Sequence, residues 1–220
     1  MITETKYTVP LDIIEEARQG VYTESKSILN KPTGRFFYDP WVIKDEYKNT
    51  VWEKILNTLP NNVGEARVIN LGYGKTYQSH SDIDDRYHLN ISGNQSYLID
   101  LDNLDMHATV VDGRWYEMDA GRLHAATNYG EIDRLQLVVR KLLKINPLEE
   151  FNHVTITCVE EHLARFNFDK HISPWLNKQN KNGKINNFLY KDTIVEFDCD
   201  ATTSSEIAKI IPKQFKLEIK

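Results

Sequence analysis

Residues 123–142 have the sequence Leu-His-Ala-Ala-Thr-Asn-Tyr-Gly-Glu-Ile-Asp-Arg-Leu-Gln-Leu-Val-Val-Arg-Lys-Leu, and this stretch decides the fold class. It holds two short segments, 123–127 and 134–142, on either side of the turn signal Tyr129-Gly130. The second segment is rich in leucine and valine, and short apolar runs bounded by glycine and polar residues favour strands. We therefore expect two β-strands here.

The same texture extends outward over residues 64–143, where segments rich in β-branched and aromatic residues alternate with turn signals. Asp112-Gly113 is a strong two-residue hairpin signal. Many short strands at this spacing, with no helical pattern between them, indicate an antiparallel sandwich or barrel. We expect a jelly roll, the double-stranded β-helix of cupin-like proteins. The further segments predicted as strands are 67–73, 87–91, 96–101, 108–111 and 115–118.

Helices are expected before this region. One is predicted to begin with Asp12 as its N-cap and to end at Gly20. A second is predicted over residues 44–59, because apolar residues recur there at helical spacing and a proline follows. These helices would form an N-terminal extension of the β domain.

The C-terminal part of the chain has a different pattern, with strands and helices predicted in the order β-α-β-β-α-β. This order is typical of a small split-βαβ module. The sequence as a whole thus predicts an α+β protein that is mainly β. We expect a jelly-roll domain with its helical extension over residues 1–147 and an α+β module over residues 148–220.

The composition argues against several classes of protein. The net charge is −5 over 220 residues, which disfavours nucleic-acid binding because phosphate neutralisation needs clustered Lys and Arg. Cys158 and Cys199 provide no disulfide framework and are expected to be buried thiols. No apolar run approaches bilayer length, and the first residues lack the pattern of a secretory signal. We expect a cytoplasmic protein with no nucleic-acid or membrane partner.

Four polar side chains have the spacing of a metal site with an anion-binding arginine. His80 and Asp82 are two residues apart, so on a strand they would point the same way and could bind one ion. His124 adds a second imidazole, and two imidazoles with one carboxylate leave open positions on a non-haem iron(II). Arg134 opens a long apolar strand that would bury its guanidinium, for which a bound carboxylate would be a partner.

The region that contains these residues resembles the aspartyl/asparaginyl β-hydroxylase family of iron(II)- and 2-oxoglutarate-dependent dioxygenases, whose relatives include bacterial free-proline hydroxylases. The resemblance covers roughly residues 34–143. It is carried by the segments of His124 and Arg134, which are ten residues apart, and by one longer stretch. That stretch is Gly74-Lys-Thr-Tyr-Gln-Ser-His-Ser-Asp-Ile-Asp-Asp-Arg-Tyr-His-Leu-Asn90.

The resemblance implies a role for each matching residue. His80, Asp82 and His124 would bind iron(II), and Arg134 would hold the distal carboxylate of 2-oxoglutarate. Arg86 and His88 match an Arg-x-His pair that contributes to the co-substrate site. Members of the family that act on protein domains lack the carboxylate ligand, so the presence of Asp82 makes this chain more like the amino-acid hydroxylases.

The activity implied by the resemblance is hydroxylation of a C–H bond, coupled to conversion of 2-oxoglutarate to succinate. The substrate would be a free amino acid, or an amino-acid side chain in a peptide or protein. Iron(II) and 2-oxoglutarate are the expected cofactors, with ascorbate as an optional reductant. The C-terminal module carries no motif, and we expect it to pack against the β domain, cover the site or mediate homo-oligomer formation.

Several residues have alternative interpretations. Arg122 could bind a substrate carboxylate but could equally face solvent, and Trp115 could line a pocket although strand aromatics are usually core. Asp84 and Asp85 compete with Asp82 as a ligand, although the adjacent pair is more typical of a turn. Two sets are given no site role: Arg140, expected at the surface, and the histidines His107, His153, His162 and His171, which lack ligand spacing.

Two other functions remain open from the sequence. A jelly roll can serve as a non-catalytic binding or accessory protein, because folds are often reused without their chemistry. Two histidines and a carboxylate also suit zinc, so a zinc hydrolase of cupin-like shape is a third hypothesis. The zinc hypothesis leaves Arg134 without a purpose and therefore ranks last.

Overall fold

The computed structural model describes residues 1–20 and 24–220, and these form two compact units. Unit 1 comprises residues 1–79 and 84–142, and unit 2 comprises residues 143–220 together with the short segment 80–83. Antiparallel sheets dominate, so the protein is mainly β with a smaller share of helix, as the sequence predicts. Neither length nor hydropathy would let any helix in the two described ranges span a bilayer.

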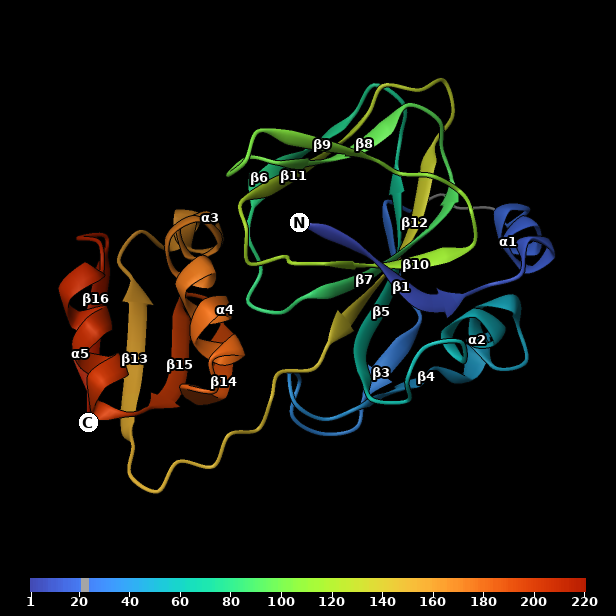
Figure 1. The fold of residues 1–220 in the computed structure, drawn as a ribbon. Coiled ribbons are helices and arrows are strands. Elements are labelled where there is room, and N and C mark those ends of the chain that lie inside the picture. Colours follow the sequence, from blue (N-terminus) through green and yellow to red (C-terminus); the bar gives the residue numbers. More distant parts are fainter. Residues whose placement is uncertain (21–23) are drawn as a thin grey trace. The chain divides into compact units, whose positions relative to one another are not determined.

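The larger sheet of unit 1 has six antiparallel strands in the order β1-β10-β7-β12-β5-β2 (Figure 1). β12 is central and pairs with β5 on one side and with β7 on the other. The leucine- and valine-rich segment expected at 134–142 is therefore an inner strand of the sheet. The strands are β1 Ile2–Thr8, β2 Lys26–Ile28, β5 Val63–Leu71, β7 Arg86–Ser92, β10 Arg114–Met118 and β12 Arg134–Lys141.

A smaller sheet has four strands in the order β6-β11-β8-β9. Leu71 and Met118 of the larger sheet pack in one cluster with Leu98 and Ala126 of the smaller one, so the two sheets face each other. A separate pair of short strands, β3 and β4, lies near the N-terminus. The bounds are β3 Asn30–Pro32, β4 Trp41–Ile43, β6 Thr76–His80, β8 Ser96–Asp100, β9 Asp105–Ala108 and β11 His124–Asn128.

The N-terminal region differs from the sequence prediction at its first elements. The strand β1 was not expected, because its sequence is largely polar; it lies at the edge of the larger sheet and pairs with β10. The helix α1 spans Leu11–Arg18, and Pro10 rather than Asp12 occupies the N-cap position. Asp12 lies in the first turn, where a carboxylate still interacts favourably with the helix dipole.

The helix predicted over 44–59 is broken into two pieces. A 3-10 turn spans Asp45–Tyr47, and the helix α2 spans Val51–Leu56. Asn49 lies between them with a φ of 58°, a left-handed conformation that interrupts a right-handed helix. Thr50 then caps α2, because its hydroxyl oxygen accepts a hydrogen bond from the backbone amide of Trp52.

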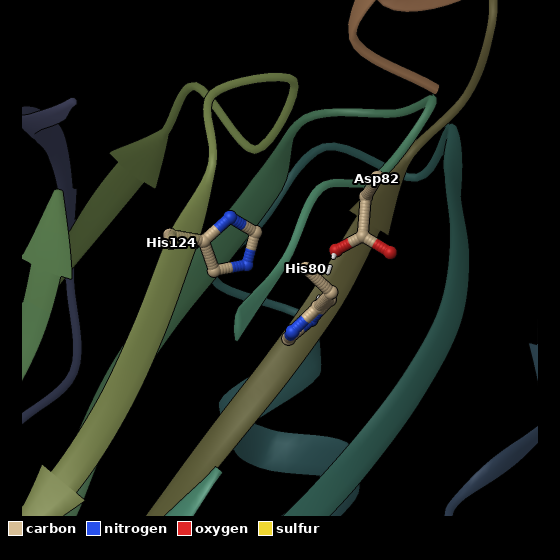
Figure 2. Close-up of side chains that lie close together, drawn as sticks. All are labelled: His80, Asp82 and His124. Carbon is tan, nitrogen blue, oxygen red and sulfur yellow. Dashed lines mark ion pairs between the residues drawn. The ribbon is translucent and has the colours of Figure 1, made fainter. Parts of the chain in front are cut away.

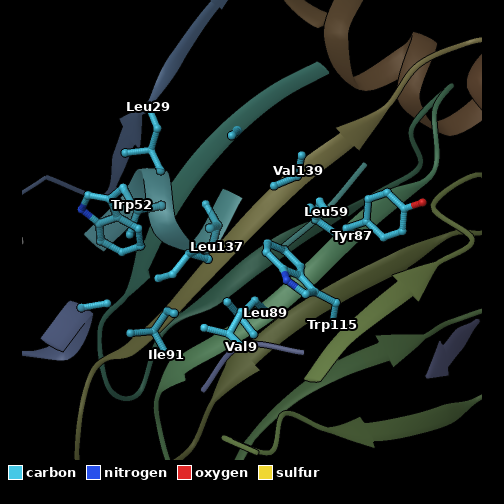
Figure 3. Packing of buried hydrophobic residues seen from close by; sticks show 14 of the residues in the cluster. Val9, Leu29, Trp52, Leu59, Tyr87, Leu89, Ile91, Trp115, Leu137 and Val139 are labelled. Atoms are coloured by element: carbon cyan, nitrogen blue, oxygen red, sulfur yellow. The ribbon is translucent and has the colours of Figure 1, made fainter. Parts of the chain in front are cut away.

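Successive side chains of a strand point to opposite faces of the sheet, so those of the central strands lie in two environments. Odd-numbered residues of β7 and β12, such as Leu89 and Leu137, join Trp115 in a core that includes residues of α1 and α2 (Figure 3). Most even-numbered residues of the same strands, among them His88 and Gln136, are polar yet buried. They lie on the face that meets the smaller sheet. This buried polar face is where a ligand would find partners.

The prediction of a hairpin at Asp112-Gly113 is wrong. β9 pairs with β8 in the smaller sheet, whereas β10 pairs with β1 and β7 in the larger sheet. The strand predicted over 108–111 ends at Ala108, and the following residues carry the chain from one sheet to the other. Gly113 has a φ of 75°, as a turn glycine should, but its carbonyl oxygen accepts from the Val9 amide at 2.7 Å. The turn therefore bonds to the N-terminal segment and not to the preceding strand.

Unit 2 contains a four-stranded antiparallel sheet in the order β14-β15-β13-β16, with its elements following one another as β-α-β-β-α-β. The helical region after β13 is interrupted by a π-helical turn, Phe168–Ile172, where the sequence predicts one continuous helix. Cys158 and Cys199 are both buried free thiols, as expected. The elements are β13 Asn152–Cys158, α3 Ala164–Asn167, α4 Ser173–Lys181, β14 Ile185–Lys191, β15 Ile194–Cys199, α5 Ala201–Ile210 and β16 Phe215–Ile219.

Candidate metal centre

Three residues that the sequence proposes as metal ligands converge in the structure. His80 is the last residue of β6, Asp82 follows two residues later, and His124 is the first residue of β11, the neighbouring strand (Figure 2). Each offers one ligand atom, and these atoms lie within 4.8 Å of one another. The Nε2 atom of His80 is 3.8 Å from a carboxylate oxygen of Asp82. Small side-chain movements would bring the three donors onto one ion.

The local backbone differs from the expectation for Asp82. Asp82 does not share a strand with His80, because β6 ends at His80 and Asp82 lies in irregular structure. Asp82 is nevertheless buried, as is His124, whereas the side chain of His80 is 35% exposed. The cluster therefore has two buried donors and one that meets solvent.

A backbone hydrogen bond fixes the orientation of the His124 ring. Its Nδ1 lies 2.8 Å from the main-chain carbonyl oxygen of Arg122. Because a carbonyl oxygen only accepts, Nδ1 carries the proton, and in the neutral ring Nε2 keeps the lone pair that a metal needs. The Arg122 side chain, for which the sequence leaves a substrate carboxylate and solvent both open, forms an ion pair with buried Asp100, its Nε lying 3.0 Å from that carboxylate. Arg122 thus acts on the site through its backbone.

Arg134 is a buried cation with few partners. It is 3% exposed and donates one Nη2 hydrogen bond to the side-chain oxygen of Gln136. Its Nε and Nη1 atoms have no hydrogen-bond partner within the described residues. Burial lowers its pKa to about 10, so the guanidinium stays charged at neutral pH. A charge buried in this way is unfavourable until an anion joins it.

His88 is the second buried group with unused hydrogen-bonding capacity. In the part of the chain that the structure describes, neither of its ring nitrogens has a hydrogen-bond partner. Burial lowers its pKa to about 3, although the nearby Gln136 amide acts in the opposite direction. The charges of Arg134, Arg86 and His124 lower this pKa further. His88 therefore lies within electrostatic reach of both arginines and of His124, a candidate metal ligand. The ring is neutral at physiological pH.

A small pocket opens beside His88 and Gln136 on the polar face of the larger sheet. Its polar lining includes Asn90, Thr109 and Tyr116. Neutral imidazole, amide and hydroxyl groups of this kind can donate hydrogen bonds to an oxyanion without adding charge. The interior of unit 1 therefore offers space, donors and one positive charge.

Arg86 has a different environment from the one the resemblance implies. It is buried and donates to the Asp84 carboxylate at 2.9 Å. Asp84 also binds Arg140 at 2.7 Å, and Arg140 pairs with Glu65 at 3.0 Å. Asp84 is thus part of an ion-pair network and not a metal donor. Arg140 was expected at the surface, but its side chain is only 11% exposed because two acids hold it.

Trp115, the aromatic residue proposed for a pocket, and two tyrosines lie in three different environments. Trp115 is fully buried in the core on the helical side, where its indole donates to the Thr58 hydroxyl at 2.9 Å. The structure therefore does not place it beside the metal ligands. Tyr116 lines the pocket beside His88, and Tyr73 is 68% exposed. Asp85 lies outside the His80, Asp82 and His124 cluster.

Two residues of the site were missed by sequence reasoning. Gln136 holds Arg134 and lines the pocket, and its position two residues after the arginine on one strand could have revealed it. Asp100 pairs with Arg122, but the sequence carries no signal for it, because the contact depends on the pairing of β8 with β11.

Comparison with known proteins adds no relative to this description. No protein-family model matches the chain, and no curated protein sequence matches it. The residues of the site and their geometry are therefore the observations that bear on function.

Proposed function

We propose that this chain is an iron(II)- and 2-oxoglutarate-dependent dioxygenase that hydroxylates a C–H bond of a free amino acid or of an amino-acid side chain in a peptide. The observation that carries the proposal is the environment of Arg134. This guanidinium is buried, has two nitrogen atoms without a hydrogen-bond partner among the described residues, and makes no ion pair there. A dicarboxylate co-substrate would supply the missing partner.

The donor set of the cluster fits iron(II). Two imidazoles and one carboxylate, from His80, His124 and Asp82, are the ligands of a facial triad and leave positions open for other ligands. The fixed tautomer of His124 presents Nε2 as a donor without rearrangement of the ring. When bound, iron(II) with 2-oxoglutarate supplies the activation of dioxygen that hydroxylation of an unactivated C–H bond requires.

The remaining groups of unit 1 would bind and orient the co-substrate. Arg134 would hold one carboxylate through its free Nε and Nη1 atoms, while Gln136 keeps the guanidinium in place. His88 is neutral and could donate a hydrogen bond to a carboxylate or keto oxygen without competing for the metal's charge. Because these groups are buried, water would be excluded once the pocket is filled.

The proposed architecture is a double-stranded β-helix, or jelly roll. Two antiparallel sheets face each other in unit 1, and the connection over 109–113 crosses from one sheet to the other. Crossings of this kind distinguish a jelly roll from a sheet built only of hairpins. The candidate ligands lie at the end of β6 and the start of β11, two adjacent strands of the smaller sheet.

The test is coupled turnover by the purified full-length chain. Incubation with iron(II), ascorbate and 2-oxoglutarate, with a panel of free amino acids and short peptides, should yield succinate together with a hydroxylated product. His124→Ala should abolish both, whereas His171→Ala, which alters an exposed histidine of unit 2, should leave them unchanged. Equal turnover by His124→Ala and the unaltered chain would remove the metal assignment. A chain that takes up no iron(II) or cobalt(II) would instead favour a non-catalytic binding protein.

A further inference from the structure

Two residues of the helical region after β13, Asp169 and Asn177, bind the backbone on both sides of Asp82. The Ser81 amide donates to the carbonyl oxygen of Asp169 at 3.2 Å, and the Ser81 hydroxyl donates to the same oxygen. On the other side, the side-chain amide of Asn177 donates to the Ile83 carbonyl oxygen at 2.9 Å. The segment 80–83 accordingly groups with residues 143–220 in the division of the chain into compact units.

These bonds replace the strand pairing that the segment lacks. β6 ends at His80, so residues 81–83 make no ladder hydrogen bonds of their own. All three residues are nevertheless buried, with Ser81 inaccessible to solvent. Buried irregular backbone needs partners for its polar groups, and here Asp169 and Asn177 provide them. The position of the Asp82 side chain therefore depends on Asp169 and Asn177.

A third contact bears on the direction of the Asp82 carboxylate. Its Oδ1 lies 3.8 Å from Nη2 of Arg165, whereas its Oδ2 lies 3.8 Å from Nε2 of His80. Arg165 is itself held by Asp169 at 2.6 Å and lies over the Tyr190 ring. With Oδ1 facing the arginine, Oδ2 is the oxygen left to share an ion with His80.

We infer that Asn177 and the Asp169 carbonyl are positioning groups that hold the segment 81–83, and with it Asp82, as a metal ligand. The inference rests on the proposed metal site. It gives the motif-free C-terminal residues a function that differs from docking or oligomer formation. A segment held before the metal arrives loses less conformational entropy on binding, so metal affinity should depend on these contacts.

The decisive measurement is the dissociation constant for cobalt(II) alone, followed by its visible absorption in the full-length chain. Asn177→Asp removes the donor and places a negative charge against the Ile83 carbonyl. We expect it to weaken cobalt(II) binding at least tenfold, as loss of outer groups around metal ligands commonly does. Asn180→Asp makes the same change on the same helix α4 and should bind cobalt(II) as the unaltered chain does.

A second variant covers the case in which Asn177→Asp does not fold. Ser81→Ala removes only the hydroxyl bond to Asp169 and keeps the amide bond, so a smaller loss of several-fold is expected. Melting temperatures without metal should be alike for Ser81→Ala and Asn180→Asp, because the effect falls on metal binding. Amide hydrogen exchange of Ser81 should be faster in Asn177→Asp than in Asn180→Asp.

The outcomes separate this inference from the proposed function. If Asn177→Asp and Ser81→Ala bind cobalt(II) as tightly as the unaltered chain, while His124→Ala does not, the metal site stands and the positioning role is refuted. If His124→Ala also binds as the unaltered chain does, or no variant binds the ion, both proposals fall. Weaker binding by the two variants, with Asn180→Asp unchanged, supports the inference.

Discussion

The Nδ1–H group of His124 donates a 2.8 Å hydrogen bond to the main-chain carbonyl oxygen of Arg122. That carbonyl is held in turn, because the side chain of Arg122, two residues before β11, is paired with Asp100 at the end of β8. Asp100 is buried and also accepts from the backbone amides of Asp102 and Asn103. One carboxylate thus organises the turn after β8 and the residue that orients His124.

Asp100→Asn should therefore weaken metal binding without contacting the metal. An amide cannot form the ion pair with Arg122, and its NH₂ group would face a cation that has only donors. We expect roughly tenfold weaker cobalt(II) binding and a loss of about 1–3 kcal/mol in the free energy of unfolding. The control is Asp105→Asn, an exposed residue that faces His107. Identical cobalt(II) affinity in both variants would contradict the role of Asp100.

Replacement of Arg134 should separate stability from co-substrate binding. Arg134→Met removes a buried charge that has no ion pair within the described residues, so the free energy of unfolding should be unchanged or rise by about 1–4 kcal/mol. The KM for 2-oxoglutarate should rise about 100-fold, equivalent to roughly 2.7 kcal/mol. Urea unfolding and steady-state kinetics on the same preparation measure the two effects.

Arg140→Met is the matched comparison for this prediction. Arg140 lies on the same strand but binds two buried acids, Asp84 and Glu65, and its guanidinium also lies 5.4 Å from the centre of the Phe36 ring. Its removal leaves two carboxylates with fewer partners, so unfolding should become easier by about 3–5 kcal/mol. Strong destabilisation by Arg134→Met as well would show that Arg134 has a structural partner.

The turn at Gly113 provides a test of the fold itself. Gly113 has a φ of 75°, and a Cβ atom at this position would overlap the carbonyl oxygen of Val9. Gly74 also has a positive φ, 67°, but a Cβ there would meet no atom within 4 Å. Gly74→Ala should therefore cost only about 1 kcal/mol, whereas Gly113→Ala should cost about 2–4 kcal/mol. Equal losses in the free energy of unfolding, measured with urea, would mean that the backbone at Val9 moves to accommodate the added Cβ atom at no cost.

The inner strands of the larger sheet could be predicted because their apolar and β-branched residues form short runs between turn signals. In β12, Leu135, Leu137 and Val139 belong to such a run and face the core in the structure. The pairing of strands could not be predicted in the same way. Asp112-Gly113 has the residues of a hairpin turn, but nothing local reveals that Val9, more than a hundred residues away, binds the turn.

The candidate ligands were predictable from spacing, but the groups that hold them were not. His80, Asp82 and His124 are recognisable by residue type, and they converge as that pattern predicts. Asn177 is nearly one hundred residues from the segment that it binds, and its contact needs no particular motif. The spacing of Arg86 matches a functional pair, but its contact with the nearby acid Asp84 was not predicted.

The last prediction concerns His88 and pH. Burial lowers the pKa of His88 from 6.5 to about 3. Between these values the unfolded chain binds a proton that the folded chain does not, so the free energy of unfolding falls as the pH falls through this range. The maximum contribution is about 1.4 kcal/mol per pH unit.

In His88→Gln this contribution is absent, and the decline of the free energy of unfolding between pH 6.5 and 4 should be less steep than in the unaltered chain. Urea unfolding at several pH values measures the slopes, and His162→Gln, an exposed site in unit 2, keeps the buried imidazole as a control. If His88→Gln and His162→Gln give the same slope, His88 is protonated equally in the folded and unfolded chains, and it is not the neutral donor that the proposed co-substrate site needs.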